Sequence, residues 1–222
     1  MSGFFLHKKA KEDIMKKFSN LSIGIICGMI FLLVYNLTSL AHNCTEIREN
    51  VLRLHIIANS DTETDQEIKL KVRDALLEKG FDIFEGCVSI DNAEELITPR
   101  IEEIEKTANT VIQSNGYSYK AEAQLATEYF DTREYEDFTL PAGKYLALKI
   151  VLGDGDGKNW WCVMFPALCL PAAEKKTDFN EVFNDKQIAI ISDSSKYKIR
   201  FRIIEIIEKI KQGDIFNLGD IE

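Results

Sequence analysis

The chain has 222 residues, of which 45% are hydrophobic and 28% charged, and its formal net charge is -9 at pH 7. This balance is typical of a globular protein, and the length allows one domain with a sizeable core. Residues 1–42 contain five lysines against Glu12 and Asp13, so residues 43–222 carry a net charge of -12. We therefore predict no nucleic-acid partner, because phosphate binding needs clustered Lys and Arg.

An apolar segment near the N-terminus is the first feature along the chain. No Asp, Glu, Lys or Arg occurs from Phe18 to Thr45. Residues 21–41 number about 20, which is the length that spans a bilayer. The lysines precede this segment, so the positive-inside rule places residues 1–20 in the cytoplasm. The sequence predicts a membrane segment over residues 21–41 and an extracytoplasmic domain over residues 45–222.

The fate of this segment stays open between two alternatives. Ser39-Leu40-Ala41 has the small-x-small pattern that signal peptidase cleaves, which favours a secreted domain. A retained transmembrane anchor fits the same residues. A buried core helix fits them less well, because the run lacks a polar face.

The globular part begins with a strand that leads into a helix. Residues 51–58 (VLRLHIIA) form a β-type run that ends at Asn59-Ser60-Asp61. Ser60 and Glu63 have the spacing of a capping box, which predicts the start of a helix there. Gly80 is a suitable stop for this helix. A short polar turn therefore joins the first strand to the first helix.

A second helical region and a long strand follow. Apolar residues recur at spacings of three and four over Ile97–Ile112, with Thr98-Pro99 as a cap or a new start. Asn115-Gly116 is expected to end this region. Tyr117–Tyr129 alternates between apolar and polar side chains, which predicts a half-buried strand with one wet face.

The C-terminal half contains two further strands and a helix. Tyr145–Leu152 and Trp160–Phe165 flank the glycine-rich segment Gly153–Gly157, which predicts an antiparallel hairpin. Isoleucines at helical spacing predict a last helix over Tyr197–Gln212. The order β-α-α-β-β-β-α indicates an α+β fold, in which helices cover a mainly antiparallel sheet and one N-terminal membrane segment precedes the domain.

The cysteines predict no metal site. Cys162 and Cys169 form a C-x6-C pair, and no second pair or nearby histidine completes four ligands. We expect neither a metal nor a cofactor. In an exported domain these two cysteines can instead form a disulfide, since Pro166 between them can turn the chain. The alternative is two buried thiols that pack as small apolar side chains.

Two segments invite an ion-binding or catalytic interpretation. Gly153–Gly157 alternates Gly and Asp, but it lacks the later ligands of an EF-hand loop, so a turn with positive φ at glycine is favoured. His55, Ser60, Asp61 and Asp65 cluster in the sequence and could serve hydrolysis. His55 lies within a strand, however, and Ser60 is needed as a cap. A hydrogen-bonded strand histidine is therefore the favoured interpretation.

The adjacent pair Trp160 and Trp161 is expected on a strand, where neighbouring side chains face opposite ways. One of the two is expected in the core. The other is a natural anchor for a protein partner if it is exposed. Plain packing of both rings is the alternative.

Five segments, in this order, resemble the stage II sporulation protein R family. They are RLHIIANSD (Arg53–Asp61), KLKVRDALLE (Lys69–Glu78), LPAGKYLALKIVLG (Leu140–Gly153), NWWCVMFPALC (Asn159–Cys169) and YKIRFRIIEII (Tyr197–Ile207). The resemblance extends over about residues 51–211, which is almost the whole of the expected extracytoplasmic domain.

This resemblance implies a function that the residues alone do not show. Proteins of this family are made in the forespore during endospore formation and are exported towards the space between the two membranes. There they trigger a membrane-embedded aspartic protease of the mother cell, which processes the sigma-E precursor. The resemblance thus implies a signalling protein and no enzyme, and it carries over no catalytic residue. The alternative is an extracytoplasmic hydrolase that acts on cell wall or peptide through His55 and nearby carboxylates.

The leading motif and the tryptophans together give a candidate partner-binding surface. A short polar turn between a strand and a helix exposes its side chains, and here it coincides with the first segment of the resemblance. The candidate residues are Arg53, His55, Asn59, Asp61, Trp160 and Trp161. The alternative for Asn59 and Asp61 is that they only cap and turn the chain.

Overall fold

The structure is a computed structural model that describes residues 2–84, 89–135, 138–166, 182–192 and 194–212. It divides the chain into two units, Met1–His42 and Asn43–Glu222, and each is described by itself. Cys169, half of the predicted disulfide, lies outside the described residues.

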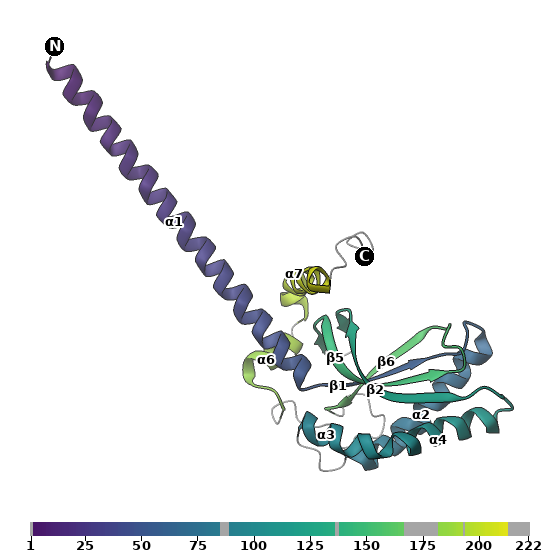
Figure 1. Cartoon of the computed structure of the whole chain (residues 1–222). Coiled ribbons are helices and arrows are strands. Elements are labelled where there is room, and N and C mark those ends of the chain that lie inside the picture. Colours follow the sequence, from purple (N-terminus) through teal and green to yellow (C-terminus); the bar gives the residue numbers. More distant parts are fainter. Residues whose placement is uncertain (1, 85–88, 136–137, 167–181, 193, 213–222) are drawn as a thin grey trace. The chain divides into compact units, whose positions relative to one another are not determined.

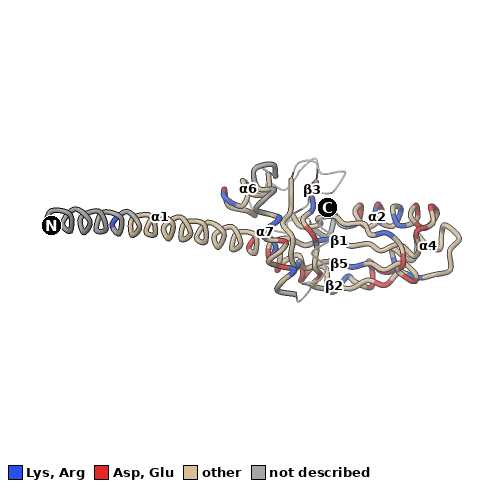
Figure 2. The backbone as a smooth tube through the Cα atoms, turned by 90° about the horizontal axis from the view of Figure 1, so that it is seen from above, with Lys and Arg blue, Asp and Glu red and all other residues tan. Residues whose placement is uncertain are grey.

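The described residues of the first unit all belong to one helix, α1, which ends within the second unit. α1 (Ser2–Glu49) contains 48 residues, and its tube is tan over most of its described length because charged residues are missing there (Figure 2). The large apolar side chains from Leu21 to Tyr35 are between 50% and 70% exposed. Within the described helices, the stretch Ser19–Glu49 is long and apolar enough to cross a membrane. By length and composition, α1 is compatible with a membrane anchor or a signal sequence.

A four-stranded sheet forms the centre of the second unit. Its strands are β1 (Leu52–Ile57), β2 (Ala121–Phe130), β5 (Gly143–Leu152) and β6 (Asn159–Phe165). They lie in the order β2-β5-β1-β6. β1 is parallel to β5, whereas the β2–β5 and β1–β6 pairs are antiparallel. The predicted α+β fold with a mainly antiparallel sheet is therefore confirmed.

The predicted hairpin between the two C-terminal strands is wrong. β1 inserts between β5 and β6 and pairs with both, so those strands are not neighbours. β1 suits a central position because Leu52, Leu54 and Ile56 are fully buried on one of its faces. Two strands joined by a short loop usually pair as a hairpin, and the local sequence therefore favoured one. Here β1 instead pairs along both of its edges, with strands about 90 or more residues further along the chain.

Helices cover one face of the sheet (Figure 1). They are α2 (Glu63–Phe84), α3 (Ile90–Ile97) and α4 (Ile101–Ser114), with the 3-10 turn η1 (Thr98–Arg100) between the last two. The core under these helices includes Leu54, Ile56, Val72, Ile97, Ala108, Ile112, Leu148 and Ile150. Full burial of one such Leu or Ile stabilises the fold by about 1.5–3 kcal/mol.

The boundaries of α2 differ from those predicted. Thr62 Oγ1, and not Ser60, accepts the hydrogen bond from the first-turn amide, that of Asp65 (3.3 Å). The predicted capping box of Ser60 with Glu63 is therefore wrong. The helix also passes Gly80 and ends at Phe84. A glycine inside a helix costs only about 1 kcal/mol, which is too little to stop a helix that packs along its length.

The remaining predicted elements match the structure with shifted ends. The second helical region restarts at η1, and Gly116, with φ of 86°, follows the end of α4 as expected. The long strand begins at Ala121, four residues later than predicted, because Ala121 pairs with Leu152, the last residue of its partner β5. The predicted last helix is confirmed as α7 (Ser194–Gln212).

Four short elements were missed by the sequence patterns, one of them α3, which precedes the predicted second helical region. β3 (Arg133–Glu134) and β4 (Thr139–Leu140) form a separate two-stranded ribbon. α6 (Asp185–Ser192) precedes α7. Strands of two residues are too short to give a periodic signal.

Candidate functional site

A polar cluster occupies the sheet face opposite α2, α3 and α4. We call it the His55 cluster; its members are His55, Glu128, Lys149, Asn159 and Trp161. They come from four strands, because the register places His55 beside Lys149 on β5 and beside Trp161 on β6. Glu128 belongs to β2, at the edge of the sheet. Four strands thus assemble a cluster whose residues are far apart in the sequence.

The His55 side chain contacts its neighbours through both ring nitrogens and through the face and edge of its ring. Its Nδ1 lies 2.6 Å from Glu128 Oε2, and its Nε2 lies 2.8 Å from Asn159 Oδ1. The ring stacks on Trp161, with centroids 5.8 Å apart, and meets Phe130 edge-on. Both ring nitrogens are therefore engaged, which fits the prediction of a hydrogen-bonded strand histidine.

The Glu128 carboxylate contacts two side chains, one through each oxygen. Lys149 Nζ donates to its Oε1 at 2.6 Å while His55 contacts Oε2. Burial raises the pKa of Glu128, but the hydrogen bonds from Lys149 and His55 outweigh it and bring the pKa below its usual value. The carboxylate is therefore ionised at neutral pH and acts as a fixed acceptor. The sequence predicted one wet face for this strand but gave no sign of the partners of Glu128.

Arg53 lies on the same sheet face but is fully buried. Its guanidinium stacks over Phe130 (4.1 Å to the ring centroid) and lies 5.0 Å from the Tyr145 ring. Nη2 donates to the Tyr135 hydroxyl at 2.6 Å, whereas Nε and Nη1 have no hydrogen-bond partner. Because no side-chain atom reaches the surface, any role of Arg53 in partner binding has to act through its neighbours.

Asn59 and Asp61 hold the turn after β1 against the loop that joins β5 to β6. Asn59 Oδ1 accepts from the amide of Asp154 (3.0 Å), and Asp61 Oδ1 accepts from the amide of Lys158 (2.7 Å). The loop passes over the end of β1, where its backbone also bonds to residues 58 and 59. This gives both side chains a structural role, and their contact with a partner stays a prediction.

Glycines allow the loop between β5 and β6 to pack closely on the turn after β1. Gly153 and Gly155 have φ of 58° and 69°, so the prediction of positive φ in the glycine-rich segment is confirmed. A Cβ at Gly153 would lie 2.0 Å from Asn59 Oδ1. The segment is thus a crossover loop that packs on the turn.

A second polar network surrounds Asp65 at the start of α2. Its oxygens accept from Asn59 Nδ2 (2.8 Å), Ser60 Oγ (2.6 Å) and the Tyr119 hydroxyl (2.9 Å). Burial raises the pKa of Asp65, but these hydrogen bonds outweigh it and lower the pKa. Ser60 and Asp65 therefore bond to each other and not to His55, so they do not form the His-centred arrangement that hydrolysis needs.

The two tryptophans face opposite sides of β6, as predicted. Trp160 packs on the helix side, where the Arg73 guanidinium lies 4.4 Å from its ring centroid. Trp161 lies in the His55 cluster, and Arg133 stacks on it at 4.1 Å. Both rings are partly buried. They line a pocket of about 340 Å³ at the β6 edge, together with residues of α2 and Tyr135.

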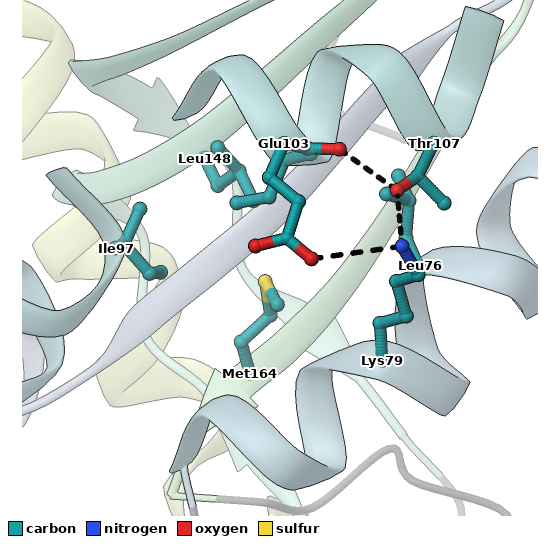
Figure 3. A pocket seen from close by; sticks show the side chains of 8 residues that line it. Leu76, Lys79, Ile97, Glu103, Thr107, Leu148 and Met164 are labelled. Carbon is teal, nitrogen blue, oxygen red and sulfur yellow. Dashed lines mark hydrogen bonds and ion pairs between the residues drawn. The ribbon is translucent and has the colours of Figure 1, made fainter. Parts of the chain in front are cut away.

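A second recess lies between the helix layer and the sheet and is too small for a ligand. Figure 3 shows Leu76, Ile97, Leu148 and Met164 around it, with Lys79 near Glu103 and Thr107. Its volume is about 10 Å³, which is room for about one water molecule. Among the described residues, no three His, Cys, Asp or Glu side chains are placed to hold a metal ion.

Cys162 is buried on β6 with 2% of its surface exposed. Because Cys169 is not among the described residues, the disulfide between them stays a prediction.

Comparison with known proteins gives the chain's family. Residues 48–175 match the family model described as stage II sporulation protein R. The chain is also 36% identical over 155 residues to stage II sporulation protein R of Bacillus subtilis (strain 168), an alignment that covers 65% of this chain and 69% of the relative. No solved structure matches the chain. The chain therefore belongs to the stage II sporulation protein R family and has a role in sporulation.

Proposed function

We propose that the chain is an exported signalling protein of endospore formation, made in the forespore. On the far side of the membrane it activates a membrane-embedded aspartic protease of the mother cell, which then processes the sigma-E precursor. The observation that carries this proposal is the match to the stage II sporulation protein R family over more than half of the chain.

The N-terminal helix supports the exported location. Lysines precede an uncharged helix that is long enough to span a bilayer, and the acidic domain follows it. By the positive-inside rule, this order keeps the N-terminus in the cytoplasm and places the domain outside. The helix serves either as a retained anchor or as a cleaved signal.

The chemistry of the His55 cluster supports binding over catalysis. A general base takes a proton from a nucleophile or a substrate, but the two partners of His55 are the Glu128 carboxylate and the Asn159 amide oxygen, which have no proton to give. Glu128 is held by Lys149 and His55 at once. Such a saturated cluster fixes the shape of a surface, which suits a protein that acts by contact.

Co-expression in a host that does not sporulate tests the proposal. The host would contain the candidate protease, the sigma-E precursor and the full chain, and processing would be followed by immunoblot. We expect the processed sigma factor to accumulate at least tenfold more with the chain than without it. A variant that lacks residues 2–42 should stay in the cytoplasm and fail. Equal processing with and without the chain refutes the proposal.

A further inference from the structure

The pocket at the β6 edge combines apolar walls with an unusual local charge. Its walls include the Trp160 and Trp161 rings, Leu77 of α2 and Tyr135. A volume of about 340 Å³ is at the lower end of the range for binding pockets, and it suits one large side chain. Tryptophan and tyrosine are the residue types that most often dominate protein interfaces.

Two arginines beside this pocket lack acidic partners in the described part of the chain. The Arg133 guanidinium stacks on Trp161, and no acidic side chain of the described residues pairs with it. Arg53 is fully buried, bonds to the hydroxyl of Tyr135, and keeps two donors unpartnered. Arg73 and Asp74 also line the pocket, but they are paired with each other (2.6 Å), so their charges compensate. Among the described residues, no acidic side chain pairs with the positive charge of Arg133 and Arg53 beside Trp161 and Tyr135.

This local positive charge is opposite in sign to the net charge of the domain. Residues 43–222 carry a net charge of -12, so an acidic partner segment is repelled by most of the surface. The guanidinium groups of Arg53 and Arg133 are a local exception to this repulsion, because no acidic side chain of the described residues pairs with either of them. Arginine stacked on an aromatic ring keeps its edge donors free for a carboxylate, and it loses little entropy on binding because the stack fixes it.

We propose that this pocket binds a large apolar side chain of the partner protein, and that an adjacent Asp or Glu of the same partner segment pairs with Arg133. The identity of that partner rests on the proposed function, whereas the chemistry of the site does not. Trp161 links the two halves of the site, because its ring lines the pocket and carries Arg133. Arg53 acts behind Tyr135 as a positioning residue that adds positive charge.

The chain's own tryptophans report on this site. Trp160 and Trp161 are the two tryptophans of the whole sequence, so tryptophan labelled with 15N gives two indole signals, and both belong to the pocket. The full chain in detergent micelles would be titrated with the capped dipeptide Phe-Glu. Capped Phe-Gln and Ala-Glu are the matched probes without the carboxylate and without the large apolar side chain.

We expect Phe-Glu to shift both indole signals and the two control dipeptides to shift them at least fivefold less at equal concentration. In the Arg133→Gln variant, Phe-Glu and Phe-Gln should give equal shifts. Equal shifts from all three dipeptides, no shift at all, or a carboxylate preference that survives in Arg133→Gln each overturn the proposal.

Sigma-E precursor processing separates this inference from the proposed function. Arg133→Glu should lower processing about tenfold, while Arg100→Glu, the same charge change on the η1 turn of the helix layer, should stay within twofold. Unfolding midpoints of both variants show whether they fold. Normal processing by Arg133→Glu overturns the inference and leaves the proposed function standing. Failure of the wild-type chain overturns the proposed function, and the dipeptide titration still decides about the pocket.

Discussion

The Gly153→Ala substitution tests how the turn after β1 is held. Gly153 has φ of 58°, where an alanine costs about 1–2 kcal/mol. The new Cβ would lie 2.0 Å from Asn59 Oδ1, so the Asn59 side chain would have to move. That movement breaks its hydrogen bonds to the Asp154 amide and to Asp65. The loss adds about 2–3 kcal/mol, because the second bond involves a charged acceptor.

The expected total for Gly153→Ala is about 3–5 kcal/mol of unfolding free energy. Gly116→Ala is the matched control. Its φ is 86°, but no atom lies within 4 Å of the added Cβ, so strain alone applies and the cost is about 1–2 kcal/mol. For a domain of this size, 1 kcal/mol lowers the melting temperature by about 2–4 °C. Gly153→Ala should therefore melt several degrees below Gly116→Ala.

Urea unfolding of the full chain in detergent would be followed by tryptophan fluorescence, because both tryptophans lie in the domain. A double-mutant cycle with Asn59→Ala sharpens the assay. Without the Asn59 amide, Gly153→Ala should cost only its strain of about 1–2 kcal/mol. If Gly153→Ala costs the same in both backgrounds, or no more than Gly116→Ala, the contact between the loop and Asn59 does not hold the turn.

Three further outcomes are expected. The pKa of Glu128 is lower in the folded state than its unfolded-state value of about 4.5, so this carboxylate stabilises the fold at every pH above that value. The stabilisation is lost as the pH falls through the lower folded-state pKa. Glu128→Gln should therefore lose about 1–2 kcal/mol at pH 7 and flatten the pH dependence of urea unfolding, while the exposed Glu122→Gln on the same strand should leave both unchanged. Alkylation of the exported protein without reduction, followed by mass spectrometry, should leave Cys162 and Cys169 unmodified; a bridge there stabilises by about 2.5 kcal/mol, and labelling of both after denaturation contradicts it. Asp61→Lys should lower signalling and stability in equal proportion if Asp61 only holds the loop, and signalling alone if it also contacts the partner.

Local patterns were sufficient for the longer helices of the domain and for most strands. The spacing of apolar residues predicted α4 and α7, and alternation predicted β2, because each of these elements buries one stripe or face. The same patterns could not give the position of β1. A buried strand carries no mark of which neighbours it will have, so sequential pairing was the natural prediction and proved wrong.

The candidate site was predicted only in part, for a related reason. His55 and Trp161 were selected from the sequence, and the structure stacks them against each other. Glu128 and Asn159 complete the His55 cluster from positions 73 and 104 residues away. Contacts of this range depend on strand order, so they could not be found before β1 was known to lie between β5 and β6.

Most of the candidate residues in the segment Arg53–Asp61 have structural roles, and this affects how variants in that segment are interpreted. Arg53 points into the domain and bonds to Tyr135, whereas Asn59 and Asp61 bond to the loop that joins β5 to β6 and hold it over the end of β1. Because Trp161 is on β6, a substitution in the turn can disturb the partner surface without ever having touched the partner. Loss of signalling in such a variant is therefore evidence of contact only when the unfolding free energy is unchanged. By that criterion the direct contacts are to be sought around Trp161 and Arg133, where side chains are partly exposed and no acidic side chain of the described residues pairs with the Arg133 guanidinium.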